Sequence, residues 1–222
     1  MTEASAGPAD APGYPEEQAY PEELRFGFGE ILALLAVHGG DAAPGTAELL
    51  GLDDYTQLPE VIASGASSLV ARGFAHVGPS AELAIDGPIA GIAAALGGAE
   101  RRMDLTLEAP GLTDRIVVLE AQGVAILLRP RAYSTWWALP QRADVPPAEA
   151  TFMLVQGHLA EHPDGRVLVE RHEVGQGYAL SVRRTGDGGW LLGVKPPGAE
   201  GAHEEPGDAA ALLAALRAVR ND

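Results

Sequence analysis

The stretch GHLAEHP contains three side chains that could together hold and use a zinc ion, namely His158, Glu161 and His162. In an H-x-x-E-H motif on a helix, the two histidines bind zinc and the glutamate activates a water molecule for hydrolysis. The helix must continue through both histidines if their side chains are to share one face. Pro163 follows His162 directly and disfavours the helical conformation at that residue, so we expect the second ligand at or beyond the helix end.

A third zinc ligand is also missing from the expected place. The inverted zinc peptidases, which this motif resembles, take a glutamate from a second helix further along the chain. The one later helix expected here contains no glutamate, and Glu200, Glu204 and Glu205 are expected in a loop rich in glycine and proline. The glycine-rich stretch 186–189 joins two expected strands and opens no helix, so it is not a phosphate-binding loop. We therefore expect no enzyme, with no catalytic, cofactor-binding or metal-binding residues.

The overall composition limits the class of partner. The chain has 222 residues, with 15 Lys and Arg against 31 Asp and Glu, and its formal net charge is −16. This charge disfavours nucleic acids and anionic membranes, because both require clustered basic side chains. Cysteine is absent, which excludes disulfides and thiol chemistry. Neither a bilayer-spanning stretch nor a signal segment is recognised, so we expect a cytoplasmic location.

The first hundred residues divide into a leader and a helical segment. Residues 1–21 are acidic and proline-rich with little aliphatic bulk, which predicts a disordered leader. Residues 22–100 carry apolar residues at helical spacing, interrupted by glycine pairs and one short hairpin. The expected helices run from Leu24 to His38, over 45–50, over 58–72 and over 87–96, with the two hairpin strands between the last two helices.

Residues 101–222 are predicted to form a mostly antiparallel sheet with covering helices that shares one core with the helical segment, giving an α+β fold. Alternating apolar and polar residues predict the strands, and Asp208 is expected to cap the last helix. The expected strands are 103–107, 115–121, 124–129, 135–139, 166–174, 178–185 and 190–194, with a helix over 147–161. The hairpin RIVVLEAQGVAILL from Arg115 resembles RVLVERHEVGQGYALSV from Arg166, so an internal duplication is left open.

The order of three helices, a two-stranded wing and a fourth helix is typical of a winged-helix segment. DNA binding by that class requires Arg, Lys, Asn or Gln on the outer face of the third helix. Between Gly45 and Ala75, however, four acidic residues stand against Arg72 alone. A DNA-binding transcriptional regulator is therefore the second hypothesis for the function.

The passage SSLVARGFAHVGPSAELAIDGPIAGIAAALGGAERRMDLTL resembles the early segment of EspG-type chaperones of actinobacterial type VII (ESX) secretion. In that family a helix ends in an L-x-x-R-G-like stretch, here Leu69 to Gly73, followed by a short wing, another helix and an opening strand. The paired hairpins are similar to the two-halved sheet of the family, and the resemblance covers roughly Leu24 to Arg220. It implies a non-enzymatic cytosolic chaperone or adaptor that holds helical secreted substrates, PE–PPE-like, in soluble form.

A cluster of aromatic residues is the expected partner-binding site. Tyr133, Trp136 and Trp137 lie within five positions, and aromatic side chains dominate the binding energy of protein interfaces. Strand alternation sends Trp136 and Trp137 to opposite faces, so at least one is expected to stay accessible. We expect Trp137 in the sheet core and leave Trp136 open between core and surface. The expected partners are secreted helical proteins, with no nucleic acid and no membrane, and a homodimer is left open.

Overall fold

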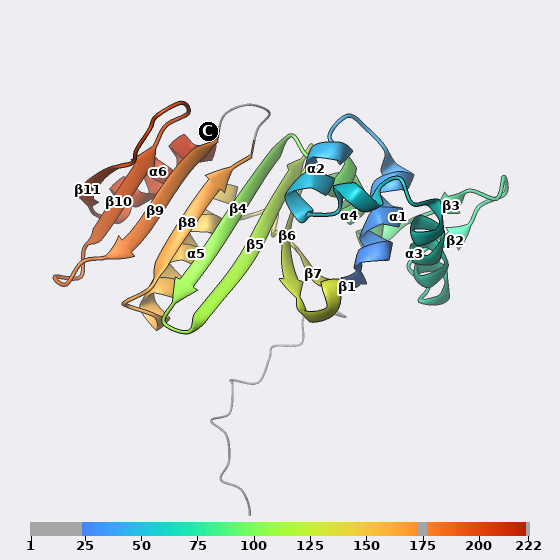
Figure 1. The fold of residues 1–222 in the computed structure, drawn as a ribbon, viewed down its shortest axis with the longest axis horizontal. Coiled ribbons are helices and arrows are strands. Elements are labelled where there is room, and N and C mark those ends of the chain that lie inside the picture. The colour runs from blue at the N-terminus through green and yellow to red at the C-terminus, as the bar shows by residue number, and fades with distance from the viewer. Residues whose placement is uncertain (1–23, 173–176, 221–222) are drawn as a thin grey trace, which may run out of the picture.

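A computed structural model describes residues 24–172 and 177–220 of the chain (Figure 1). Within these ranges it contains helices α1 (Phe28–His38), α2 (Ala43–Leu50), α3 (Pro59–Ala71), α4 (Gly87–Gly98), α5 (Pro147–Glu161) and α6 (Ala209–Arg220), and the short turns η1 (Asp53–Tyr55) and η2 (Ala132–Ser134). None of these helices combines the length and the apolar character needed to cross a membrane. The acidic leader predicted over residues 1–21 lies outside the described residues.

One large antiparallel sheet dominates the described part of the chain. Its strands are β1 (Leu24–Gly27), β4 (Arg101–Ala109), β5 (Leu112–Ala121), β6 (Val124–Arg131), β7 (Thr135–Pro140), β8 (Arg166–Arg171), β9 (Tyr178–Arg184), β10 (Trp190–Lys195) and β11 (His203–Gly207). They lie in the order β1-β7-β6-β5-β4-β8-β9-β10-β11. Strands β2 (His76–Val77) and β3 (Leu83–Ala84) form a separate small hairpin. The predicted α+β class is confirmed.

The first predicted helix is wrong at its beginning. Leu24 was expected in this helix, but it lies in β1, which pairs with β7 in antiparallel register. The helix begins only at Phe28, after Gly27 in an extended conformation, and the Gly27 N–H donates to the Glu30 carboxylate at 2.9 Å. Leu24 fits the helical spacing of the residues that follow it, so the spacing alone could not separate the strand from the helix.

The last strand, β11, is absent from the prediction. Its sequence HEEPG contains no apolar alternation, and Glu204 and Glu205 were expected in a loop. The segment becomes a strand because β10 offers it a free edge, with Val194 paired to His203 and Trp190 to Gly207. Such pairing depends on a neighbouring strand and leaves little trace in the local sequence.

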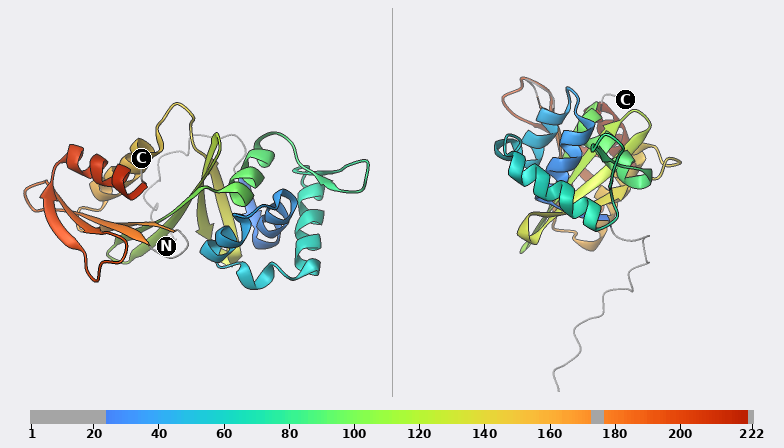
Figure 2. Two further views of the ribbon diagram at one scale, coloured as in Figure 1. Left: turned by 90° about the horizontal axis from the view of Figure 1, so that it is seen from above. Right: turned by 90° about the vertical axis from the view of Figure 1, so that its right-hand side faces the viewer.

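The helices cover opposite faces of the sheet in its two halves, and β5 lies where the cover changes sides (Figure 2). On β5, Val117 and Leu119 belong to a core formed with α1 to α4, β6 and β7. The alternate residues Ile116 and Val118 belong to a second core formed with α5, α6, β4 and β8 to β10. The helical segment shares the first core with one half of the sheet, and the sheet has a second core on its other face.

The strand order is symmetrical about β4. Strands β5, β6, β7 and β1 on one side correspond to β8, β9, β10 and β11 on the other, and Trp136 and Trp190 each lie in the core of their own half. Strands β5 and β8 both run antiparallel to β4 and therefore run in the same direction as each other. The helices cover one face of the sheet in the first half and the other face in the second half. The two halves are therefore related approximately by a twofold axis that runs along β4. An internal duplication would produce this arrangement. The alignment of Arg115 with Arg166 pairs Ile116 with Val167, and both belong to the second core. The twofold relation would instead put equivalent residues on opposite faces, so this alignment does not match the symmetry of the sheet.

A buried cluster of charges joins the last helix to the central strands. Arg220, at the end of α6, is 1% exposed and donates from both Nη atoms to the Glu120 carboxylate of β5. Arg101 of β4 donates to the same carboxylate at 2.9 Å. The carboxylate is thus compensated by two guanidinium groups, and the C-terminal helix is fixed to a strand that contributes to both cores.

We expect Arg220→Ala to lower the free energy of unfolding by about 3 kcal/mol, because the buried Glu120 carboxylate loses one of its two guanidinium partners and keeps only Arg101. Urea denaturation followed by tryptophan fluorescence measures the change. Arg217→Ala is the matched control, since Arg217 lies on the same helix and pairs with Glu149 at the surface. The control should cost less than about 1 kcal/mol. Equal losses for both variants would contradict the importance of the buried pair.

Helices α1 and α3 approach each other at a pair of glycines. A Cβ atom on Gly65 would lie 1.8 Å from the carbonyl oxygen of Gly29, so the two backbones are in direct contact there. Near this crossing Ser68 Oγ donates to Glu30 at 2.7 Å, and Arg72 at the end of α3 donates to the same carboxylate at 2.7 Å. The close approach and the buried carboxylate together fix α3 on α1.

We expect Gly65→Ala to destabilise the fold by at least about 1–3 kcal/mol, because the added methyl group meets backbone atoms that cannot move aside. Gly157→Ala in α5 is the control, since nothing lies within 4 Å of its added Cβ. That variant should stabilise the protein by about 0.5–1 kcal/mol through helix propensity. Thermal or urea denaturation measures both, and a neutral Gly65→Ala would show that the helices can separate at little cost.

Candidate partner-binding site at the β6–β7 corner

The three residues that could have bound zinc do not form a metal site. Helix α5 ends at Glu161, and His162 leaves the helical region at φ −124° and ψ 79°, as the following proline predicts. The His158 ring lies with Nε2 2.9 Å from the Glu108 carbonyl oxygen. Across the described ranges, no group of three His, Asp or Glu residues is placed to hold a metal ion.

The connection between β6 and β7 holds two consecutive residues in the left-handed backbone region. Tyr133 has φ 60° and Ser134 has φ 54°, and neither is a glycine. Such residues carry strain of about 1–3 kcal/mol each and persist only where the surrounding structure enforces them. Thr135 closes the turn by donating from Oγ1 to the Ala132 carbonyl at 2.9 Å. The result is a tight corner from which the Tyr133 side chain extends into solvent, 98% exposed.

The two tryptophans of β7 lie on opposite faces, as predicted, but the expectation that Trp137 packs in the sheet core is wrong. Trp136 is 5% exposed and belongs to the first core, where its register partner on β1 is Phe26. Trp137 lies partly exposed on the other face between two guanidinium groups, with Arg25 4.7 Å and Arg131 4.5 Å from its ring centre. Trp136 is therefore largely buried, whereas Tyr133 and Trp137 are more accessible.

An open pocket of about 450 Å³ lies beside the corner on the face that carries the helices. Aromatic and aliphatic side chains make up much of its wall, and Arg115 and the backbone end of β6 at Pro130 and Arg131 also border it. The apolar side chains that line it are Phe28, Leu50, Leu52, Tyr55 and Trp136. Phe28 and Tyr55 meet edge to face at 5.6 Å, and Tyr55 is 42% exposed. The corner thus combines a projecting aromatic ring with an adjoining concave surface.

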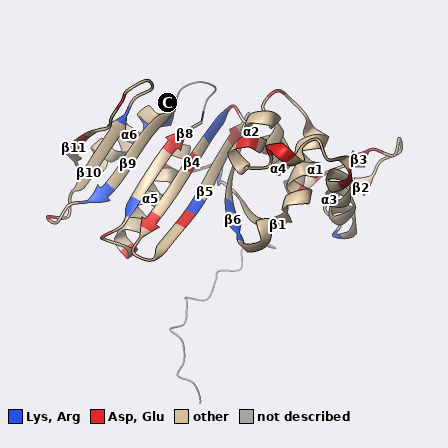
Figure 3. Ribbon diagram, viewed as in Figure 1, with Lys and Arg blue, Asp and Glu red and all other residues tan. Residues whose placement is uncertain are grey.

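On the opposite face, three arginines surround Trp137 and form, with it, the arginine–tryptophan patch (Arg25, Arg129, Arg131 and Trp137). Trp137 is the cross-strand partner of Arg25 on β1 and of Arg129 on β6. Arg129 and Arg131 both donate to Asp114 of β5. Figure 3 shows basic positions on β6, beside the mixed charges of the neighbouring strands β5 and β4.

The arginines control the ionisation of Asp114. Burial by itself would raise the pKa of this carboxyl group, but the hydrogen bond and charge of Arg129, the backbone N–H of Arg115 and the charge of Arg131 outweigh it. The net effect holds the pKa of Asp114 below its ordinary value. One ionised carboxylate therefore serves two guanidinium groups at the edge of the patch.

The sequence identified the aromatic residues of this corner but not the arginines. Arg129 and Arg131 alternate on one strand and could have been assigned to the same face as Trp137 by strand parity. Arg25 could not, because it was assigned to a helix. The pocket residues on α1, α2 and η1 come from three separate segments, and only the packing of these segments against β7 brings them together.

Comparison with known proteins adds no identification. The chain matches no protein-family model, and a search of curated proteins also gives no match. The interpretation of the corner therefore depends on its geometry and on the residues that form it.

We expect Asp114 to contribute to the acid sensitivity of the fold. Its pKa is lower in the folded than in the unfolded state, where a value of about 3.9 applies. The carboxylate therefore stabilises the fold above that pH, and the stabilisation is lost as the pH falls through the folded-state pKa. Asp114→Asn should make the free energy of unfolding fall less steeply below about pH 4, measured by urea denaturation over a pH series.

Asp144→Asn is the comparison for the pH experiment. The pKa of Asp144 is also lowered, chiefly by a hydrogen bond from Arg142, but both side chains are exposed, so solvent screens the pair. Its replacement should change the pH profile less than Asp114→Asn does. Identical profiles for wild type and Asp114→Asn would show that the arginines do not act on Asp114 in this way.

Proposed function

We propose that this protein is a non-enzymatic, cytoplasmic chaperone or adaptor of the EspG type that binds helical secreted proteins, PE–PPE-like, through the β6–β7 corner. The observation that carries the proposal is Tyr133, a large ring 98% exposed on two consecutive strained residues. Strain of this kind is concentrated at functional sites. Since the exposed ring gains almost no packing against the described residues, we assign its role to contact with another polypeptide.

The surfaces beside Tyr133 suit the apolar stripe of an amphipathic helix. In helix-in-groove recognition, side chains three and four residues apart insert into apolar depressions. The 450 Å³ pocket, walled by Phe28, Tyr55 and Trp136, offers one such depression next to the corner. The sheet, with helices on opposite faces of its two halves, supports the resemblance to the two-halved EspG layout.

DNA binding by the winged-helix segment stays the second hypothesis. The order α1, α2, α3, the β2–β3 hairpin and α4 agrees with that class. Helix α3 contains no lysine or arginine, however, and Arg72 at its end forms an ion pair with Glu30. A gel-shift assay at low salt, where phosphate contacts are strongest, separates the two hypotheses, because a chaperone of this charge should not retard the DNA.

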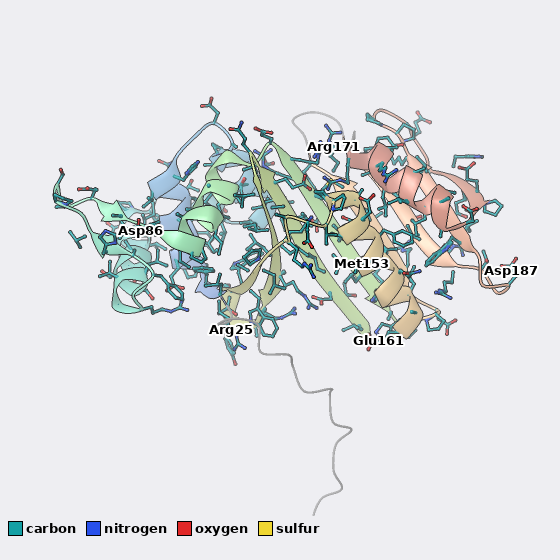
Figure 4. The ribbon with its side chains drawn as sticks, turned by 180° about the vertical axis from the view of Figure 1, so that it is seen from behind. Arg25, Asp86, Met153, Glu161, Arg171 and Asp187 are labelled. Atoms are coloured by element: carbon teal, nitrogen blue, oxygen red, sulfur yellow. The ribbon has the colours of Figure 1, made fainter. Side chains whose placement is uncertain are left out.

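We expect Tyr133→Ala to weaken binding of a helical PE–PPE-like protein by about 30-fold or more, which is the effect of removing an interface hot spot. The test co-expresses the chain with such proteins encoded near its gene and measures the affinity of the purified complex by calorimetry. Met153→Ala is the control, since Met153 is 63% exposed on α5, away from the corner (Figure 4). Equal losses for both variants, or no complex with any candidate partner, would overturn the proposal.

A further inference from the structure

The part of the chain that precedes β1 is strongly acidic. Residues 1–23 hold six acidic side chains and no lysine or arginine, although the chain has 15 basic residues in all. The acidic positions are Glu3, Asp10, Glu16, Glu17, Glu22 and Glu23. This segment is joined directly to β1, the edge strand that contributes Arg25 to the arginine–tryptophan patch. Its end is therefore fixed beside the patch by the covalent chain.

The patch has the complementary charge and an accessible surface. Arg129 and Arg131 share the single carboxylate of Asp114, which leaves an excess of positive charge among the described residues of the patch. On this face α5 and α6 pack over β4, β5 and β8 to β10, and the patch lies beside them on β1, β6 and β7. Figure 4 views this side of the molecule, with Arg25 near one end of the sheet and Asp187 at the other.

The geometry of the patch suits carboxylates rather than a neutral ligand. Arg25 and Arg131 each place a guanidinium group over the Trp137 ring, at 4.7 Å and 4.5 Å from its centre, and these cation–π contacts hold both groups against a flat apolar surface. Stacked guanidinium groups keep their N–H donors at the edges, where carboxylates can accept hydrogen bonds. An acidic chain crossing the patch could pair with them without displacing the ring.

We propose that residues 1–23 bind in cis to the arginine–tryptophan patch and cover Trp137. Tethering gives the acidic segment an effective concentration in the millimolar range at the patch, so weak ion pairs suffice for it to be bound. A separate acidic polypeptide would have to displace this segment, so the two would compete for the arginine–tryptophan patch. The proposal does not depend on the function proposed above, because it concerns two parts of one chain.

The test places a spin label in the acidic segment of the full chain. The protein has no cysteine, so Ala9→Cys accepts a single nitroxide, and the indole N–H signals of the tryptophans report its proximity. We expect the Trp137 signal to be broadened in the labelled protein, while the Trp190 signal on distant β10 is not. The broadening should disappear in 1 M salt, where the screening length is only about 3 Å.

Two arginine variants make the test specific. Arg131→Gln should abolish most of the broadening at Trp137 while leaving the Arg129–Asp114 pair in place. Arg183→Gln on β9, which removes an exposed arginine paired with Glu204, should leave the broadening unchanged. Circular dichroism of each variant confirms that it is folded. If Trp137 is broadened no more than Trp190, or stays broadened in Arg131→Gln, the proposal is wrong.

A mixed sample distinguishes binding in cis from binding between copies. Protein that carries the nitroxide but no ¹⁵N is mixed with ¹⁵N-enriched protein that carries no nitroxide. Broadening of the observed signals can then arise only from contact between molecules. We expect the Trp137 signal of the mixture to be as sharp as that of the unlabelled protein. Broadening in the mixture equal to that in the labelled chain would show that the acidic segment binds a second copy, which overturns the proposal.

Discussion

Strand β5 has to satisfy two cores at once, and the rest of the architecture follows from this constraint. Val117 and Leu119 face one layer of helices, while Ile116 and Val118 face the other. A strand buried on both faces needs a nearly continuous apolar run, which the sequence IVVL supplies. The run ends at Glu120, and its charge is compensated by Arg101 and Arg220. The two halves of the protein are therefore joined through one strand and one buried carboxylate.

The change of helical cover at β5 also decides which surfaces remain open. In the N-terminal half the helices occupy the face that contains Trp136, so the face that contains Trp137 is left without them. In the C-terminal half the covered face is the other one. The β6–β7 corner lies at the end of the sheet where the pocket on the covered side and the arginine–tryptophan patch on the open side come close together. Tyr133 projects from the turn that separates these two surfaces.

Arginines act in two different ways in this acidic chain. Arg102 and Arg115 on the central strands hold α2 against the sheet by donating to the carbonyl oxygens of Ala42 at 2.9 Å and Leu49 at 2.8 Å. Burial lowers the pKa of Arg102 in the process. Arg25 and Arg131 instead stack on an aromatic ring at the surface. Arg102 and Arg115 therefore stabilise the packing of α2 on the sheet, whereas Arg25 and Arg131 present positive charge at the surface.

The sequence by itself determined the features that are set by a few neighbouring residues. Pro163 predicted the end of α5 at Glu161, and Asp208 caps α6 by accepting from the Ala211 N–H at 2.8 Å. Alternation placed Trp136 and Trp137 on opposite faces, but which face is buried depends on helices that lie far away in the sequence. Edge strands β1 and β11 formed because β7 and β10 offered hydrogen-bonding partners, and the arginine–tryptophan patch required three strands in register. Neighbouring residues determine turns, helix caps and hydrophobic periodicity. Contacts between distant segments determine which sheet face the helices cover and which strands pair.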